Sequence, residues 1–270
     1  MRIVRLNGDL LKKTVNEILK VSELQGVPWS RYPELNRILK GFRPNELTVL
    51  SGHTGVGKTT FLCEYSLDLA EQGVSTMWGS FEMPLRKICR TILHQFAGES
   101  LSPSAPHRVV QWAAMFSETV PMCFMDCHGS QSESEIFKTM DEGVKQLGTS
   151  GNYFEERFQR QDRFVQKLRT FANERKVHLT VVVHPRKEDL DKRLTISSLY
   201  GGGKISQEAD NVLLIQTETD TAYPKKYVQV VKNRYDGTLG SMDLVFHKDR
   251  LSYRPRPKQL LVPAEIRSSL

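Results

Sequence analysis

The segment Gly52-His53-Thr54-Gly55-Val56-Gly57-Lys58-Thr59 fits the phosphate-binding loop pattern G-x-x-x-x-G-K-[ST] at every position. Residues 46–50 before it read as a buried strand, and residues 60–70 after it carry apolar side chains at helical spacing. A loop in this position points backbone N–H groups at phosphates, and the helix N-terminus adds positive potential. The pattern therefore predicts a nucleoside triphosphate site. A chance glycine-rich turn is the alternative, and the order of strand, loop and helix argues against it.

The loop also predicts its own division of labour. We expect Lys58 to contact the terminal phosphates and the Thr59 hydroxyl to ligate Mg²⁺, so that ATP or another nucleoside triphosphate binds with Mg²⁺. The candidate nucleotide-binding residues are Gly52, His53, Thr54, Gly55, Val56, Gly57, Lys58, Thr59 and Thr60.

Composition bounds the rest of the chain. The 270 residues, 39% of them hydrophobic, are enough for one large core, and the formal net charge of +7 suits a polyanionic partner without proving one. No apolar stretch is long enough for a membrane span, so we expect a soluble protein. The four scattered cysteines are expected to be free thiols. A metal site at Cys123, Cys127 and His128 is disfavoured because no second ligand pair follows at zinc-like spacing.

The order of the expected elements predicts the fold class. Strands are expected at 74–78, 121–125, 177–183, 211–216, 227–232 and 244–246, in addition to 46–50, with amphipathic helices between the earlier ones and a helix at 9–24. Strands that alternate with helices and then follow one another predict an α/β fold. We expect a RecA-like P-loop NTPase core with a mostly parallel central sheet and a C-terminal antiparallel extension.

One step of this alternation is absent from the pattern. A helix ending near Leu147 is followed by a second helical pattern at Phe154, Phe158, Val165 and Leu168, and no strand is predicted between them. A RecA-like ATPase has there a hydrophobic strand ending in an acidic residue, which we expect beside the strand of the phosphate loop. We therefore predict that this strand, and the second acid of the magnesium site, are missing.

Several segments in order resemble a known family. They are residues 31–41, 52–59, 78–82, 184–189, 206–211 and 232–237. Together they resemble the helicase domain of the Twinkle family of mitochondrial replicative DNA helicases, which is related to the phage primase-helicases. The resemblance covers roughly residues 29–253 and implies a linker helix for subunit contact at 1–28, a RecA-like helicase domain at 29–253 that lacks a strand near 147–148, and a tail at 254–270. It also implies a splice variant, a fragment or a gene model that has lost this strand, and a primase-like domain is absent.

The resemblance implies roles for two strand-end residues. Glu82 would orient and deprotonate a water aimed at the γ-phosphate. His184 would sense the γ-phosphate and relay its state to DNA. Without the resemblance, a strand-end glutamate is more often a solvated surface residue, and a lone histidine is more often structural.

Two basic residues near the chain's end are spaced as neighbours on one strand face. Lys232 and Arg234 lie two apart, so their side chains point the same way. The resemblance implies that this pair crosses a subunit interface and that the arginine stabilises charge on the neighbour's γ-phosphate. An ordinary charged strand face is the alternative.

Contacts to DNA are expected from loops. Arg186, Lys187 and Lys204 are the candidates, because a polar segment ending in three glycines lets the backbone approach a phosphate chain. A solvated turn would explain the same charges.

These observations lead to three hypotheses. The first is an ATP- and Mg²⁺-dependent DNA helicase subunit that forms a hexameric or heptameric ring, acts on single-stranded or forked DNA and works in mitochondrial DNA replication, a location implied by resemblance only. The second is a hydrolysis-deficient module of the same family that binds nucleotide and single-stranded DNA. The third is a RecA-like recombinase, disfavoured by the Lys232–Arg234 strand and by the His-Pro-Arg-Lys loop.

Overall fold

A computed structural model describes residues 6–19, 26–126, 132–147, 152–156, 162–186, 193–199, 202–218 and 224–256. Within these ranges the strands form one nine-stranded sheet in the order β3-β2-β4-β5-β1-β6-β7-β8-β9. The strands are β1 (Leu47–Gly52), β2 (Thr76–Ser80), β3 (Met122–Met125), β4 (Asn152–Glu156), β5 (His178–Val182), β6 (Asn211–Glu218), β7 (Lys225–Asn233), β8 (Gly240–His247) and β9 (Ser252–Pro255).

The sheet has a parallel part and an antiparallel part. The pairings from β3 through to β6 are all parallel, whereas β6–β7, β7–β8 and β8–β9 are antiparallel. Parallel neighbours need crossover connections, which here are helices, and the last strands can follow one another through short turns. The predicted mostly parallel sheet with a C-terminal antiparallel extension is confirmed.

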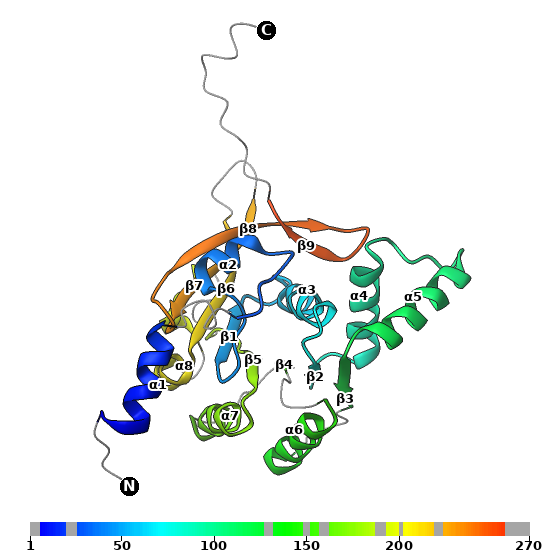
Figure 1. The fold of residues 1–270 in the computed structure, drawn as a ribbon. Helices are drawn as coiled ribbons and strands as arrows, with labels where there is room; N and C mark the ends of the chain where they lie inside the picture. The colour runs from blue at the N-terminus through cyan, green and yellow to red at the C-terminus, as the bar shows by residue number, and fades with distance from the viewer. Residues whose placement is uncertain are drawn as a thin grey trace, which may run out of the picture.

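Helices cover both faces of the parallel part (Figure 1). The helices are α1 (Gly8–Leu19), α2 (Pro33–Leu39), α3 (Lys58–Glu71), α4 (Leu85–Ala97), α5 (Pro106–Thr119), α6 (Glu133–Leu147), α7 (Asp162–Arg175) and α8 (Gly202–Glu208), with a short 3₁₀ turn at Ile196–Ser198. Figure 1 shows α3 and α4 on one side of the sheet and α6 and α7 on the other. None of the helices in the described ranges is long and apolar enough to cross a bilayer.

The pleat of the central strands divides the interior into two cores. On β1, Leu50 packs among the residues of α3 and α4, while Val49 packs among those of α6 and α7. On β6, Leu213 and Leu214 divide in the same way. Successive side chains of a strand point to opposite faces, so a strand buried on both faces needs apolar residues at nearly every position. This explains why β1 and β6 are readable from sequence as continuous apolar runs.

The strand predicted to be missing is present. β4 lies between β2 and β5 and pairs with both in parallel, with Glu156 opposite Ser80 and Val182. The prediction of two consecutive helices is therefore wrong, as is the placement of this strand next to the phosphate-loop strand, because β5 separates β4 from β1. The pattern missed β4 because only Tyr153 and Phe154 of its residues are apolar. Their spacing to later apolar residues also happens to match a helix.

Other differences lie at element ends and in unassigned segments. The helix predicted at 9–24 is described as Gly8–Leu19, with residues 20–25 outside the described ranges. Helices α2 and α5, each with a proline in its first turn, and strand β9 were not predicted. Val27 pairs with Phe42 and β9 runs to Pro255, so sheet and bridge pairing extends past both ends of the predicted 29–253 domain. Cys63, Cys89 and Cys123 are free thiols as predicted, and Cys127 and His128 lie outside the described residues.

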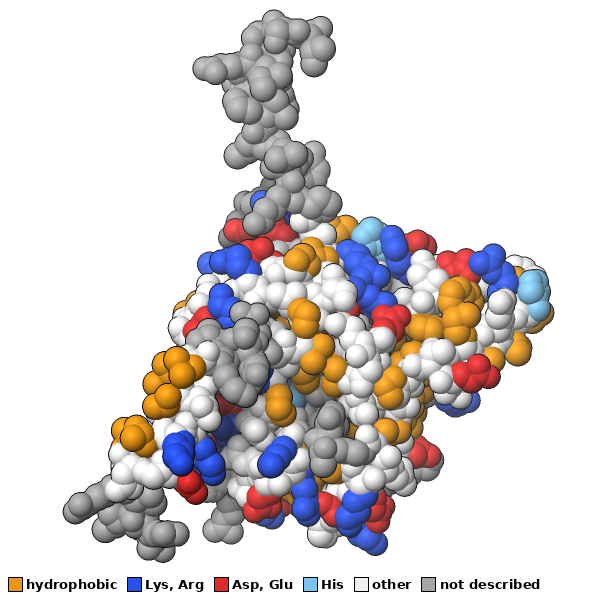
Figure 2. Space-filling model, in the orientation of Figure 1, with side chains coloured by type: hydrophobic (Ala, Val, Ile, Leu, Met, Phe, Trp, Pro, Cys, Tyr) orange, Lys and Arg blue, Asp and Glu red, His pale blue; other side chains and the backbone are white. Residues whose placement is uncertain are grey.

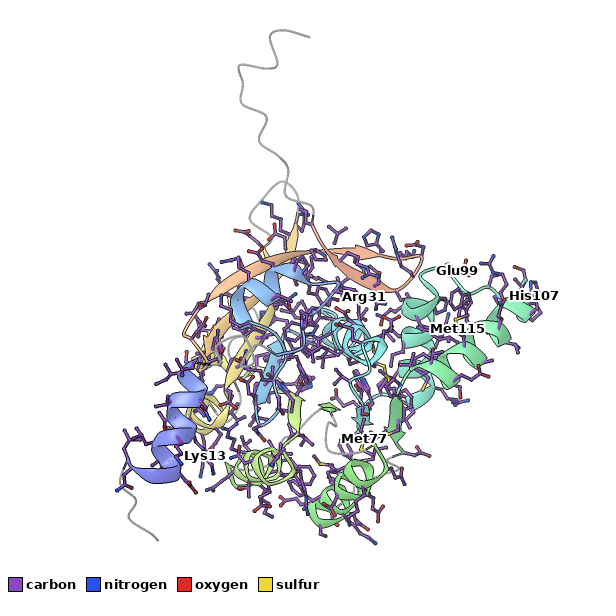
Figure 3. All side chains as sticks on the ribbon, viewed as in Figure 1. Lys13, Arg31, Met77, Glu99, His107 and Met115 are labelled. Atoms are coloured by element: carbon purple, nitrogen blue, oxygen red, sulfur yellow. The ribbon has the colours of Figure 1, made fainter. Side chains whose placement is uncertain are left out.

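The segment before β1 is tied to α3 by buried charge. The Asp68 carboxylate accepts hydrogen bonds from the backbone N–H groups of Ser30 and Arg31, at 3.1 and 2.8 Å. The Arg31 guanidinium contacts Glu64 and Glu71 of α3, and Figure 3 shows Arg31 beside this helix. Arg254 of β9 contacts the same Glu64 at 3.0 Å. Burial raises the pKa of the Glu64 carboxyl, against the lowering effect of the two arginines. The helix that follows the phosphate loop is thereby joined to both ends of the domain.

Candidate nucleotide site and its surroundings

The predicted phosphate-binding loop connects the carboxyl end of β1 to the start of α3 (Figure 1). Gly55 and Gly57 have φ angles of +77° and +99°, which side-chain-bearing L residues rarely adopt. A Cβ on Gly52 would lie 2.7 Å from the carbonyl oxygen of Ile215, so only glycine fits this approach to β6. Gly57 is also the N-cap of α3 and no side chain caps this helix end. The loop and helix end together form a backbone cradle of the kind that binds phosphate.

Lys58 is held over this cradle. Its Nζ donates hydrogen bonds to the carbonyl oxygens of Gly52 and His53, at 2.9 and 3.1 Å. The Lys58 side chain is buried, so its charge faces the loop rather than bulk solvent. Thr59 follows in the first turn of α3, where its hydroxyl is placed as expected for a magnesium ligand. These features fit a nucleoside triphosphate with Mg²⁺.

The loop is braced from the antiparallel extension. Lys226 Nζ, on β7, donates to the carbonyl oxygen of Val56 at 2.7 Å and to the Tyr253 hydroxyl at 2.8 Å. The Tyr253 hydroxyl, on β9, donates to the same Val56 carbonyl at 3.3 Å. Tyr253 is buried, and its ring lies where a Cβ on Gly57 would be. The sequence patterns gave no sign of these contacts, because Lys226 and Tyr253 belong to no motif.

Glu82 and His184 come together at the same edge of the sheet as the loop. Both follow the carboxyl ends of parallel strands, β2 and β5, and His184 Nε2 lies 3.5 Å from Glu82 Oε2. The hydroxyl of Ser80 donates to the Met83 carbonyl and accepts from the Met83 N–H, which fixes the turn that carries Glu82. About a third of the Glu82 side chain is exposed, so water can reach it. In open α/β sheets ligands bind outside the carboxyl ends of the strands.

The end of β4 reaches the same edge. Its last residues are Glu155 and Glu156, and the register places Glu156 level with the last residues of β2 and β5. The chain therefore has acidic residues where the missing acid was expected. Whether either of them serves a magnesium ion stays a prediction.

Lys232 and Arg234 lie at the opposite edge. Lys232 pairs with Val212 near the start of β6, and Arg234 follows the end of β7. Lys232 Nζ donates to the carbonyl oxygens of Ser206 and Ala209. Arg234 donates to the carbonyl oxygen of Gln207 and to Asp210 Oδ1, the latter at 3.0 Å. Burial, and then the nearby Arg234 charge, lower the pKa of Lys232. The six residues of β1 separate this edge from the phosphate loop, which amounts to about 17 Å at roughly 3.3 Å per residue.

Asp210 anchors this second edge. Its carboxylate accepts from the Leu47 N–H at 2.8 Å and pairs with Arg169 of α7 as well as with Arg234. Arg169 and the start of β1 thus hold the residue that holds Arg234. Sequence reasoning missed Asp210 as a site residue, although it stands inside one of the segments that carry the family resemblance.

The candidate DNA contacts are only partly described. Arg186 is exposed, with its backbone N–H donating to the Ser198 carbonyl at 2.8 Å and its Nε to the Leu199 carbonyl at 3.3 Å. Lys204 is half-buried in α8. Lys187 lies outside the described residues. The structure brings Arg186 and Lys204 onto neighbouring elements, since the 3₁₀ turn packs against α8, and does not test their role.

Beneath the loop strand lies a buried histidine. His178 Nδ1 is 2.6 Å from the Arg43 carbonyl oxygen and its Nε2 is 2.9 Å from the Thr48 hydroxyl. Its ring stacks on Phe42 with centroids 3.9 Å apart. Burial lowers the pKa of His178 to about 3. The ring is therefore neutral at the start of β5 and serves the packing of the sheet.

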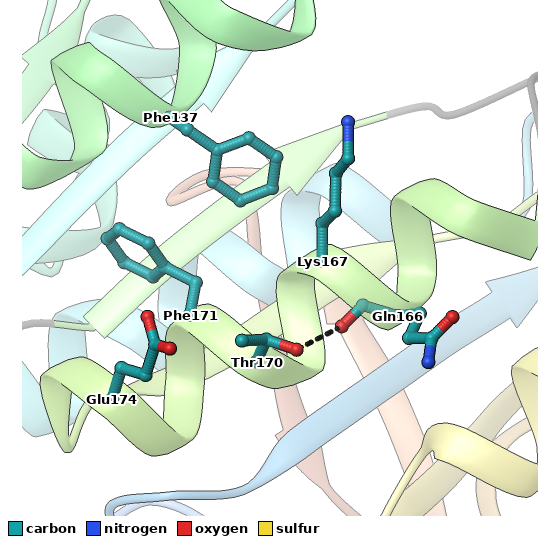
Figure 4. Close-up of a pocket in the computed structure, with 6 residues that line it drawn as sticks. All are labelled: Phe137, Gln166, Lys167, Thr170, Phe171 and Glu174. Carbon is teal, nitrogen blue, oxygen red and sulfur yellow. Dashed lines mark hydrogen bonds between the residues drawn. The ribbon is translucent and has the colours of Figure 1, made fainter.

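Two apolar surfaces remain at the periphery. Figure 2 shows hydrophobic side chains gathered along α1, where Leu10, Leu11, Val15 and Ile18 are all exposed. On the α6–α7 face there is a groove of about 620 Å³ (Figure 4). Phe137 and Phe171 line its apolar part. The remaining lining residues are Gln166, Lys167, Thr170 and Glu174.

Comparisons with known proteins agree with this architecture. The family model described as "AAA domain" matches residues 16–150, half of the chain. The replicative DNA helicase DnaB of Mycoplasma genitalium is 25% identical over 280 residues, which cover 90% of this chain and 58% of that protein. The chain thus spans less than two thirds of that relative's length.

Two solved structures share the fold. One is an isolated ATPase domain, which superposes with a TM-score of 0.78 at 16% identity, covering 92% of this chain and 99% of that one. A DnaB-like replicative helicase, solved in a study of its interactions with primase, gives a TM-score of 0.77 at 17% identity, covering 92% and 68%. At these identities the likeness shows the fold, which confirms the predicted RecA-like class.

Proposed function

Because this chain belongs to the AAA-domain family, we propose that it is the ATPase core of an ATP-dependent DNA helicase of the DnaB-like type, related to the phage primase-helicases. One observation carries the proposal. The phosphate-binding loop, Glu82 and His184 meet at one edge of a RecA-like sheet, while Lys232 and Arg234 stand at the other edge. The sheet therefore holds a nucleotide site and, well away from it, a cationic pair that can serve a different subunit's nucleotide.

In the proposed site the chain's own groups position and activate. The loop's N–H groups and Lys58 bind the β- and γ-phosphates, and Glu82 orients a water in line with the γ-phosphate and accepts its proton. His184, 3.5 Å from Glu82, can report the presence of the γ-phosphate to the following Pro185-Arg186 segment. Mg²⁺ held by Thr59, with an acid from the end of β4, would neutralise charge on the phosphates.

The second edge implies a ring. Arg234 cannot reach the nucleotide of its own chain across the length of β1, so a catalytic role for it requires a second copy whose phosphate loop faces it. A head-to-tail contact of this kind is heterologous, and it closes into a ring when the rotation between copies is a whole fraction of a turn. A hexamer or heptamer is the proposed assembly.

The exposed stripe of α1 supports the same assembly. Leu10, Leu11, Val15 and Ile18 form an apolar face that no element of the described chain covers, and such faces on soluble proteins mark contact surfaces. We assign α1 of one copy to the Phe137–Phe171 groove of the next, where the apolar groove floor would cover the stripe.

Single-stranded or forked DNA is the proposed nucleic-acid partner. Arg186 and Lys204 would contact its phosphates, which are independent of base sequence. The net charge of +7 is consistent with such a partner. From the family resemblance alone we further propose a mitochondrial location, which imaging of a tagged full chain would test.

The test of function is the ATP hydrolysis rate of the purified chain with and without single-stranded DNA, after its size in solution has been measured. DNA-stimulated turnover by an oligomer, lost in a Glu156→Gln or Glu155→Gln variant, supports the helicase assignment. Nucleotide binding without turnover supports the alternative, a hydrolysis-deficient module that binds nucleotide and DNA. That alternative rested on a missing strand, and β4 removes this ground.

A further inference from the structure

The peptide between Val56 and Gly57 is fixed from outside the phosphate loop. Its carbonyl oxygen accepts two hydrogen bonds, from Lys226 Nζ at 2.7 Å and from the Tyr253 hydroxyl at 3.3 Å. Lys226 also donates to the Tyr253 hydroxyl at 2.8 Å, so the two donors support each other. Both come from the antiparallel extension, which lies far from the loop in sequence.

Fixing this carbonyl has a geometric result. In a trans peptide the C=O and the following N–H point in opposite directions. Holding the Val56 carbonyl toward β7 and β9 therefore turns the Gly57 N–H away from those strands, toward the side on which the loop surrounds a phosphate. A loop without this anchor can rotate the peptide and present a carbonyl oxygen, whose partial negative charge repels phosphate.

Steric contacts act in the same direction. The Tyr253 ring occupies the space beside Gly57 that a side chain would need, and Gly57 has a φ of +99°. Lys226 further lies 5.0 Å from the centroid of the Tyr253 ring, within range of a cation–π contact. The ring, the ammonium group and the glycine therefore restrict one another.

We propose that Lys226 and Tyr253 are positioning residues for nucleotide binding, a clamp that preorganises the Val56–Gly57 peptide so that the loop's N–H groups face the phosphates. This inference rests on the proposed nucleotide site and is independent of helicase activity. Preorganisation raises affinity because ordering the loop is no longer charged against binding. The clamp acts through the loop, so it changes affinity for the diphosphate as well as for the triphosphate.

The experiment measures Mg·ADP binding by calorimetry on the purified full chain, giving Kd and stoichiometry for each variant. Lys226→Met removes a charged hydrogen bond and should weaken binding about tenfold with stoichiometry unchanged. Tyr253→Phe keeps the ring and should weaken binding about threefold. Lys226→Arg retains a donor and should recover most of the loss. Lys225→Met, one residue earlier on the strand and therefore facing the other way, is the matched charge control and should bind normally.

The outcomes separate a clamp from a structural role. A folding defect lowers stoichiometry at unchanged Kd, and circular dichroism on each variant shows it independently. The clamp is wrong if Lys226→Met binds within twofold of the natural chain, if it loses only stoichiometry, or if Lys225→Met weakens binding equally. If the natural chain itself binds no nucleotide, the proposed function fails first, and the clamp fails with it.

Discussion

Arg234→Ala gives the sharpest test of the division between the two edges of the sheet. In its own chain Arg234 is separated from the phosphate loop by the length of β1, about 17 Å at roughly 3.3 Å per residue. The variant should therefore bind nucleotide with a Kd close to that of the natural chain. If Arg234 serves the neighbouring nucleotide, turnover should fall by about 10³-fold or more, which corresponds to roughly 4 kcal/mol of lost transition-state stabilisation.

The structure also limits what the substitution can do to folding. The Arg234 side chain is 46% exposed, and Asp210 keeps its bonds to Arg169 and the Leu47 N–H when Arg234 is removed. Loss of such a half-exposed ion pair costs about 0–1 kcal/mol. Arg108→Ala, at a comparably exposed arginine paired with Glu99, is the matched control and should leave turnover unchanged.

The assay that refutes the reasoning is a mixture of two inactive variants. Arg234→Ala subunits keep an intact phosphate loop, and Lys58→Ala subunits keep an intact Arg234. In rings formed from equal amounts, roughly a quarter of the interfaces combine both intact halves, so steady-state ATP hydrolysis should return to about a quarter of the natural rate. If no activity returns although the subunits exchange, Arg234 acts within its own chain or not at all.

Further predictions concern binding, chemistry, stability and assembly. Lys58→Ala should abolish Mg·ATP binding, whereas Glu82→Gln should keep binding and lose turnover about 10²-fold or more, which calorimetry and a steady-state assay distinguish. His178, whose folded-state pKa is about 3, takes up its proton only on unfolding below its ordinary pKa near 6.5. Stability should therefore be fully present above that value and fall by about 2 kcal/mol at pH 5, continuing down to about pH 3, and urea titrations should show a smaller decline in His178→Gln. Val15→Asp, on the exposed face of α1, should reduce the oligomer to smaller species in sedimentation without lowering the melting temperature of the domain. The same dissociation from Phe171→Asp but not from Lys12→Asp, a charged position on the same helix, would support the assigned groove, and intact rings in both apolar variants would contradict it.

Some of this molecule follows from short stretches of sequence. The phosphate loop is such a case, because its glycines, lysine and threonine are contiguous and their roles depend on local backbone geometry. The long apolar runs of β1, β5 and β6 are another, since strands buried on both faces must be apolar throughout. Strand β4 shows where this reasoning stops. Its Asn-Tyr-Phe-Glu-Glu sequence has little strand character of its own, and it becomes a strand through pairing with β2 and β5 on either side.

The sequence by itself determined that this chain carries a nucleotide loop in a RecA-like core, and it pointed to Glu82, His184, Lys232 and Arg234. Only the tertiary structure decided how these residues divide between two edges of one sheet, and that Lys226, Tyr253 and Asp210 hold the groups that act. The physical reason is that motifs record backbone geometry within a few residues, whereas the order and direction of the strands set which distant side chains meet. In this chain a strand that begins beside the phosphate loop ends beside Arg234, and no local pattern contains that fact.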